Sequence, residues 1–78
     1  MRVGDRIIVE QKGFLEVCGR IIRGTIHDVG LRGAYFSAPE QPEPGTQALL
    51  RGPGGWVAVR VVWSQASGNA GVGLAFEV

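Results

Sequence analysis

A chain of 78 residues with a net charge of +1 is expected to form one domain, residues 1–78, because domains rarely divide below about 100 residues. Its hydrophobic fraction of 45% argues against disorder, and no apolar run approaches the roughly 18–20 residues of a membrane helix. The near-neutral charge argues against general nucleic-acid binding. Without a secretory signal, the expected location is the cytoplasm.

The first third of the chain predicts two strands. Residues from Arg6 to Val17 are rich in β-branched side chains and predict one long strand, or two short strands with a kink near Lys12–Gly13. A turn follows at Gly19, and the segment from Ile21 to Val29 predicts the second strand.

The middle of the chain predicts two further strands separated by a loop. After the glycine-rich stretch Gly30–Gly33, the segment Ala34–Ala38 resumes as a strand. The segment Pro39–Gly45 contains three prolines, which cannot donate to a strand ladder and therefore predict a loop. Thr46–Arg51 predicts a strand, and Gly52–Gly55 predicts a turn.

The last third shows the clearest alternation. Trp56–Trp63 alternates with a period of two, which places Trp63 on the same face as Val59 and Val61. Gly71–Val78 alternates in the same way. About six short strands at regular spacing indicate an all-β sandwich or barrel. Closure into a small antiparallel β-barrel is favoured, because an open sheet of this size would leave unpaired edges.

The residues do not predict a catalytic or metal site. His27 is the only histidine, and as the strand neighbour of Asp28 it is expected to point to the opposite face of the sheet. No serine lies in a nucleophile elbow. The lone cysteine, Cys18, is expected to be a half-buried structural thiol, and one thiol with one histidine cannot build a structural metal site. We therefore expect no enzyme, no catalytic residue, no metal and no cofactor.

Two short motifs indicate ligand chemistry. Arg2 and Arg6 lie four residues apart at the start of the chain, and the run Asp28–Val29–Gly30–Leu31–Arg32–Gly33 joins two predicted strands. Seven of the eight cationic side chains are arginine. The guanidinium fork matches phosphate and the O6/N7 edge of guanine better than the point charge of lysine does.

Taken in this order, the motifs resemble those of the PilZ family of cyclic di-GMP receptors. That family has an R-x-x-x-R element on an N-terminal tail, followed by a D/N-x-S-x-x-G element. The segments Arg32–Phe36, Val59–Trp63 and Gly71–Phe76 are also similar to the family's strands, so the resemblance covers nearly the whole chain. It implies a six-stranded antiparallel β-barrel of the PilZ-like, split-barrel type, with residues 1–6 as a flexible arginine tail.

The resemblance also implies a set of ligand-binding residues. Its members are Arg2, Arg6, Asp28, Gly30, Arg32 and Gly33. The tail arginines would engage guanine edges and phosphates, and Asp28 would accept hydrogen bonds from guanine N–H groups. Gly33 would let the backbone turn beneath the ligand without a Cβ. Gly30 departs from the pattern, because it replaces the family's serine and keeps only the backbone N–H for a phosphate. Arg32 is a candidate to compensate.

Three functions are open at this point. The first is a cyclic di-GMP-binding receptor or adaptor domain in bacterial second-messenger signalling, with cyclic di-GMP and a downstream protein as partners. The second is a PilZ-like barrel that does not bind cyclic di-GMP and acts as a protein-interaction module, which Gly30 favours. The third is a small nucleic-acid-binding β-barrel whose Tyr35, Phe36 or Trp56 stacks on bases, although the low net charge counts against it.

Overall fold

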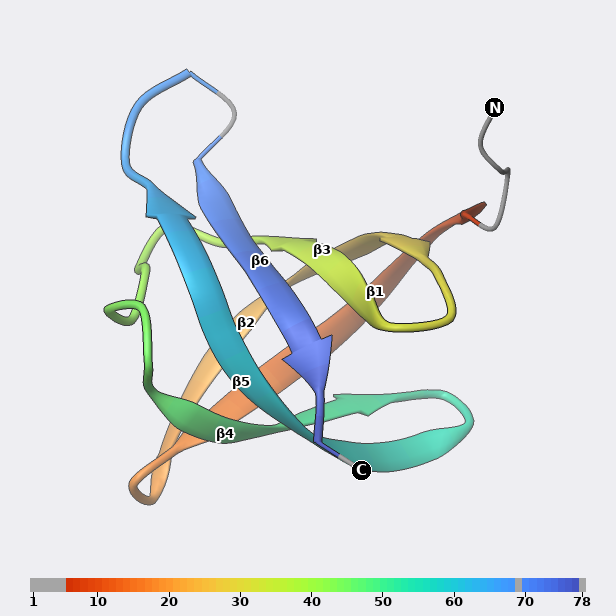
Figure 1. The fold of residues 1–78 in the computed structure, drawn as a ribbon, viewed down its shortest axis with the longest axis horizontal. Coiled ribbons are helices and arrows are strands. Elements are labelled where there is room, and N and C mark those ends of the chain that lie inside the picture. The colour runs from red at the N-terminus through yellow and green to blue at the C-terminus, as the bar shows by residue number, and fades with distance from the viewer. Residues whose placement is uncertain (1–5, 69, 78) are drawn as a thin grey trace.

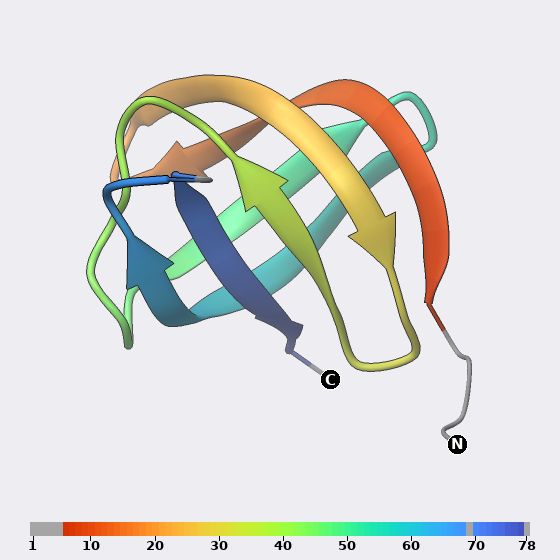
Figure 2. The ribbon, with the colours of Figure 1, turned by 90° about the horizontal axis from the view of Figure 1, so that it is seen from above.

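The computed structural model describes residues 6–68 and 70–77, and every element in them is a β-strand. The strands are β1 (Ile7–Val17), β2 (Arg20–Val29), β3 (Gly33–Ser37), β4 (Gln47–Gly52), β5 (Gly55–Gln65) and β6 (Gly71–Phe76). They pair in antiparallel fashion into a closed barrel in the order β1-β2-β3-β6-β5-β4 (Figures 1 and 2). The predicted six-stranded antiparallel β-barrel is confirmed. The described residues include no helix long and apolar enough to cross a membrane.

The turn between β1 and β2 consists of Cys18 and Gly19. Their φ angles of 49° and 81° are those of a type I′ turn, which matches the right-handed twist of the two strands. The predicted turn at Gly19 is therefore confirmed. The prediction for Cys18 is wrong, because its thiol is exposed at the tip of the hairpin rather than half-buried.

The barrel interior is filled by one apolar cluster to which all six strands contribute. The buried members are Leu15, Val17, Ile22, Ile26, Ala34, Phe36, Ala38, Ala48, Leu50, Val59, Val61, Val72 and Leu74. These residues follow the alternation expected for strands with one face turned to a core. Phe36 is 0% exposed, so it cannot stack on a nucleic-acid base, which corrects one part of the nucleic-acid hypothesis.

A β-bulge bends β1 near its N-terminal end. The register of β1 against β2 shifts between Ile8 and Gln11, and Glu10 has a φ of 48°. Of the two alternatives predicted here, one long strand is confirmed, because β1 runs unbroken from Ile7 to Val17. The alternative of two strands with a kink near Lys12–Gly13 is wrong, since these two residues pair regularly with β2. The bulge falls in the part of β1 that pairs with β2 alone, because β1 meets β4 only from Phe14 to Glu16.

A second bulge lies in β2, where the pairing with β3 shifts between Ile26 and Asp28. Ile26 is buried in the core, whereas His27 bonds to the exposed Glu10 and Asp28 bonds to the exposed Arg6. The expectation that His27 and Asp28 point to opposite faces is wrong, because the extra residue cancels the alternation. Both side chains reach the outer surface of the barrel.

A third bulge lies in β5 and reorients Trp63. Val61 pairs with Leu74, but Trp63 pairs with Gly73, so one extra residue separates the two positions on β5. Val61 is 0% exposed, as is Val59, while Trp63 is 44% exposed. The prediction that Trp63 shares a face with Val59 and Val61 is therefore wrong, since the bulge turns its ring to the outside of the barrel.

Candidate ligand-binding site

Arg6 and Asp28, from the two predicted motifs, meet on the outer wall of the barrel. They are 22 residues apart in sequence, and Arg6 Nε donates to Asp28 Oδ1 over 2.9 Å. The Nη2 group of Arg6 forms an ion pair with the same oxygen. Within the described residues, Asp28 Oδ2 accepts no hydrogen bond, so this oxygen is available to a ligand. Arg2 and the rest of the predicted tail up to residue 5 lie outside the described residues.

The loop from β2 to β3 is a tight connection of three residues, Gly30, Leu31 and Arg32. The Gly30 N–H donates to the Gly33 carbonyl over 2.8 Å, which leaves Leu31 and Arg32 at the tip. The Gly30 N–H was expected to remain for a phosphate, but it is used to close this loop. A Cβ on Gly33 would lie 1.8 Å from the carbonyl oxygen of Leu74, so packing against β6 requires glycine here whether or not a ligand binds.

A cleft of about 240 Å³ lies between this loop and the outer face of β5 and β6. The residues that line it include Arg6, Arg32, Gly33, Tyr35 and Trp63. In the described part of the chain Arg32 forms no ion pair with a carboxylate. The cleft therefore combines cationic forks with aromatic surface, which suits an anionic ligand that carries flat rings.

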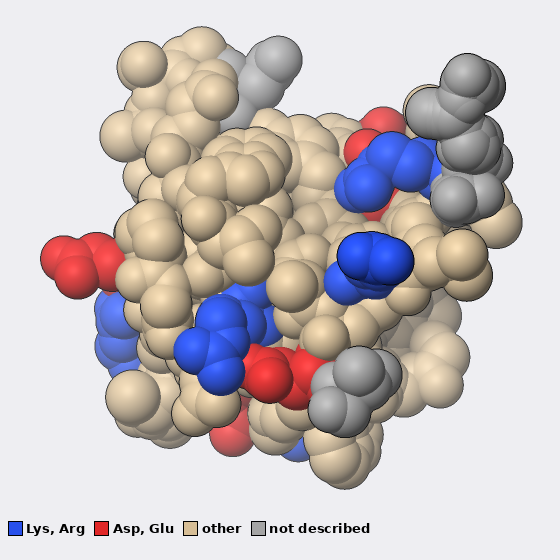
Figure 3. All heavy atoms as spheres, in the orientation of Figure 1, with Lys and Arg blue, Asp and Glu red and all other residues tan. Residues whose placement is uncertain are grey.

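Charge is concentrated unevenly around this region. Figure 3 shows cationic groups beside a carboxylate on the N-terminal side of the face drawn in Figure 1, next to a broad uncharged area. Arg60 of β5 pairs across the ladder with Ala75 of the cleft lining, but it forms an ion pair with Glu77, with Nε and Oε2 3.0 Å apart. Arg32 is therefore the exposed cation of this cleft without a carboxylate partner among residues 6–68 and 70–77.

Trp63 is a site residue that the sequence reasoning missed. Its ring stacks on Tyr35, with centroids 5.5 Å apart and an interplanar angle of 23°. It also covers Gly73, where a Cβ would lie only 2.1 Å from the indole Nε1. A glycine inside an otherwise apolar strand is a signal of such close approach, and Gly73 in the segment from Gly71 to Phe76 could have indicated it.

Glu10, His27 and Ser37 form a hydrogen-bonded chain on the same outer wall. His27 Nδ1 lies 2.8 Å from Glu10 Oε2, and His27 Nε2 lies 2.7 Å from Ser37 Oγ. Some hydrolases use a carboxylate, a histidine and a serine in this order, together with free backbone N–H groups that stabilise an oxyanion. Here Ser37 lies within β3, whose backbone pairs with β2 on one side and with β6 on the other. Because its backbone is engaged in these ladders, we assign the three side chains a structural role.

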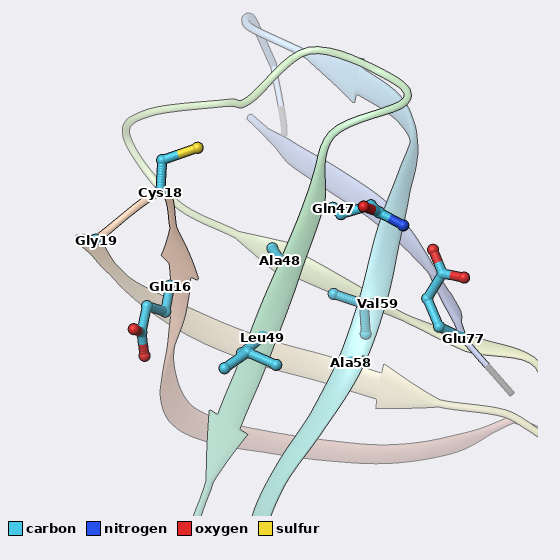
Figure 4. A pocket seen from close by; sticks show the side chains of 9 residues that line it. All are labelled: Glu16, Cys18, Gly19, Gln47, Ala48, Leu49, Ala58, Val59 and Glu77. Atoms are coloured by element: carbon cyan, nitrogen blue, oxygen red, sulfur yellow. The ribbon is translucent and has the colours of Figure 1, made fainter.

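A separate cleft of about 440 Å³ lies at the other end of β1 (Figure 4). It is lined by the β1–β2 turn, β4 and the adjoining part of β5, and includes Cys18 and the carboxylates of Glu16 and Glu77. Each carboxylate has an arginine partner, Arg51 and Arg60 respectively. None of the predicted ligand-binding residues lines this cleft. Within the described residues, no group of three or more potential metal ligands is assembled.

The fold and the cleft define a small antiparallel β-barrel with arginine and aromatic groups on its outer wall, the kind of surface that binds a ligand. Comparison with protein-family models finds a match to the PilZ domain over residues 2–78. The chain belongs to the PilZ domain family, whose members are binding and adaptor domains of the cyclic di-GMP receptor class. The resemblance of its motifs is thereby confirmed. A search of the curated proteins finds no match.

Proposed function

We propose that this domain is a cyclic di-GMP receptor that acts as a binding and adaptor module, not as an enzyme, in bacterial second-messenger signalling. The observation that carries the proposal is the cleft lined by Trp63, by Arg6, which is paired with Asp28, and by Arg32, which has no carboxylate partner within residues 6–68 and 70–77. Cyclic di-GMP has two phosphates and two guanines, which require cationic forks, a carboxylate acceptor and flat surface. As a receptor for an intracellular nucleotide, the domain would work in the cytoplasm.

The Arg6–Asp28 pair has a specific part in this proposal. Arg6 contacts only one oxygen of Asp28, and the two side chains are 56% and 24% exposed. A guanine could contact both side chains in place of their contact with each other, because its O6/N7 edge accepts from arginine and its N–H groups donate to a carboxylate. Since an exposed ion pair is worth only about 0–1 kcal/mol, a ligand could separate it at little cost. Arg2 would add a second fork from the tail.

The loop residues Gly30, Arg32 and Gly33 complete the proposed site. Arg32 would supply the phosphate contact that serine supplies elsewhere in the family, and Gly33 would keep the backbone close to the ligand. Gly30 offers neither a hydroxyl nor a free N–H, since its N–H is bonded to the Gly33 carbonyl. A missing hydrogen bond to a charged group costs about 1.5–3 kcal/mol, so we expect weaker binding than a serine at this position would give.

Calorimetric titration of the domain with cyclic di-GMP tests the proposal, with GTP as the control nucleotide. We expect saturable binding of the cyclic dinucleotide and no heat with GTP. The absence of both heat and a thermal shift with cyclic di-GMP would refute the receptor proposal.

A protein-interaction module that binds no cyclic di-GMP is the second candidate. It is favoured by the internally bonded Gly30 N–H and by large apolar side chains exposed beside the site. Ile7, Ile8 and Leu31 are 66%, 75% and 81% exposed, and neighbouring exposed apolar groups are a mark of contact surfaces. In this case the melting temperature would not respond to cyclic di-GMP, while Leu31→Glu would abolish binding of a downstream protein.

A further inference from the structure

The chain Glu10–His27–Ser37 fixes the orientation of one imidazole ring. A carboxylate only accepts hydrogen bonds, so the contact of 2.8 Å with Glu10 Oε2 places a proton on His27 Nδ1. In the neutral ring, Nε2 then accepts from the Ser37 hydroxyl over 2.7 Å. With both nitrogens bonded to groups on different strands, the ring plane cannot rotate without loss of at least one hydrogen bond.

Two bulges converge on this chain of side chains. The β1 bulge contains Glu10, whose φ of 48° is unusual for a residue with a side chain. The β2 bulge contains His27 and turns it outward beside Asp28. Bulges commonly reorient a side chain next to a functional site. Here they bring Glu10 and His27, 17 residues apart, into contact.

The immobilised imidazole is the first ring in a stack of three. His27 stacks on Tyr35 with centroids 5.2 Å apart and an interplanar angle of 24°, and Tyr35 stacks on Trp63 in nearly the same manner. His27 does not line the cleft of Arg6 and Arg32, whereas Tyr35 and Trp63 do. The stack therefore connects the hydrogen-bonded chain to the cleft through ring contacts.

We propose that His27 is a positioning residue for the ligand site: held by Glu10 and Ser37, it sets the tilt of Tyr35 and thereby of Trp63 at the cleft. The inference rests on the proposed function for its effect on ligand affinity. The effect of His27 on the orientation of Trp63 does not depend on the proposed function, because it can be measured without any ligand. Stacked aromatic pairs favour defined offset geometries, so a disturbance at one end of the stack changes the other end.

Two substitutions separate the ring of His27 from its hydrogen bonds. His27→Phe keeps a flat ring beside Tyr35 but removes both hydrogen bonds, while His27→Gln keeps a donor and an acceptor but removes the ring. The experiment is done in a Trp56→Phe background, in which Trp63 is the only tryptophan. Fluorescence and near-ultraviolet circular dichroism of the ligand-free domain report the surroundings of Trp63, and calorimetry reports the affinity for cyclic di-GMP.

We expect His27→Gln to change the Trp63 spectra and to weaken cyclic di-GMP binding by about two- to tenfold, the effect of loosening one aromatic contact. His27→Phe keeps the ring contact but not the bonds that orient the ring, so it should change the spectra and the affinity less than His27→Gln does, but measurably. Glu10→Ala and Ser37→Ala should each have smaller effects that are not additive with His27→Gln, because all three act on one ring. Arg20→Gln, on the same strand but in an exposed pair with Glu40, is the matched control and should change neither quantity.

Unchanged Trp63 spectra in both His27 variants would overturn the positioning role. If His27→Gln does not fold, Ser37→Ala and Glu10→Ala carry the same test, since each removes the hydrogen bond to only one ring nitrogen. Failure of the proposed function would be recognised separately, because the parent domain would then not bind cyclic di-GMP although the Trp63 spectra still respond to His27.

Discussion

Trp63 lies flat against Gly73, so closely that a Cβ on Gly73 would be 2.1 Å from the indole Nε1. The contact joins neighbouring positions of β5 and β6 at the bulge that turns Trp63 outward. Glycine at position 73 thus leaves the space that the Trp63 ring occupies in the candidate site. Any side chain at position 73 must displace the indole ring.

The first prediction concerns Gly73→Ala. The new methyl group must displace Trp63, which we expect to cost about 1–3 kcal/mol of unfolding free energy and to shift the Trp63 emission. Urea unfolding of the variant in the Trp56→Phe background measures both. Gly54→Ala is the matched control, because its Cβ would meet no atom within 4 Å. Equal stability of the two variants would contradict the close contact.

The second prediction concerns Arg6→Ala. A bidentate arginine contact to guanine is worth about 1–3 kcal/mol, so we expect cyclic di-GMP binding to weaken roughly ten- to hundredfold. Arg51→Ala, which breaks the ion pair between β4 and Glu16 of β1, is a control outside the cleft and should leave the affinity unchanged. Calorimetric titration of both variants measures the difference. Equal affinity of Arg6→Ala and the parent domain would remove Arg6 from the site.

The third prediction concerns Gly30→Ser, which restores the hydroxyl that the family pattern contains. Gly30 is not among the glycines with a positive φ, so serine can adopt its backbone conformation without strain. We expect tighter binding by about 1.5–3 kcal/mol, the value of a hydrogen bond to a charged phosphate. The measurement is the ratio of dissociation constants for the variant and the parent. A domain that binds only as Gly30→Ser would identify the parent as a degenerate receptor.

The fourth prediction concerns the turn at Cys18, which has a φ of 49° and precedes Gly19. Asn-Gly is the preferred pair for a type I′ turn, and the Cys18 thiol is exposed. We expect Cys18→Asn to raise the unfolding free energy by a few tenths to about 1 kcal/mol, since asparagine tolerates the left-handed region better. Thermal unfolding under reducing conditions measures the effect. A lower melting temperature would contradict this assignment of the turn.

Much of the fold could be predicted because glycines and prolines divide the chain into segments that alternate with a period of two. The buried residues Ile22, Ile26, Val59 and Val61 follow that alternation directly. It fails where a bulge adds a residue, which is why the orientation of Trp63 was wrong. Position in sequence does not reveal a bulge, because both strands must be aligned before an extra residue becomes visible.

The candidate site could be predicted only where short motifs mark it. The motif residues Arg6 and Asp28 do meet. The local sequence alone does not predict this contact, because the two residues are 22 positions apart. The partners of His27 lie 17 residues before it and 10 residues after it, on different strands. Such contacts depend on the register of neighbouring strands, which period-two alternation alone does not determine.

The seam between β1 and β4 is the shortest strand ladder of the barrel. Only Phe14–Glu16 pair there with Leu49–Arg51, whereas β3 pairs with β6 along its whole length from Gly33 to Ser37. We expect local opening to begin where the fewest ladder hydrogen bonds join two strands. Amide protons at the β1–β4 seam should therefore exchange with deuterium before those of β3 and β6. The aromatic part of the proposed site, Tyr35 on β3 and Trp63 on β5, would then stay in place in molecules whose β1–β4 ladder has opened.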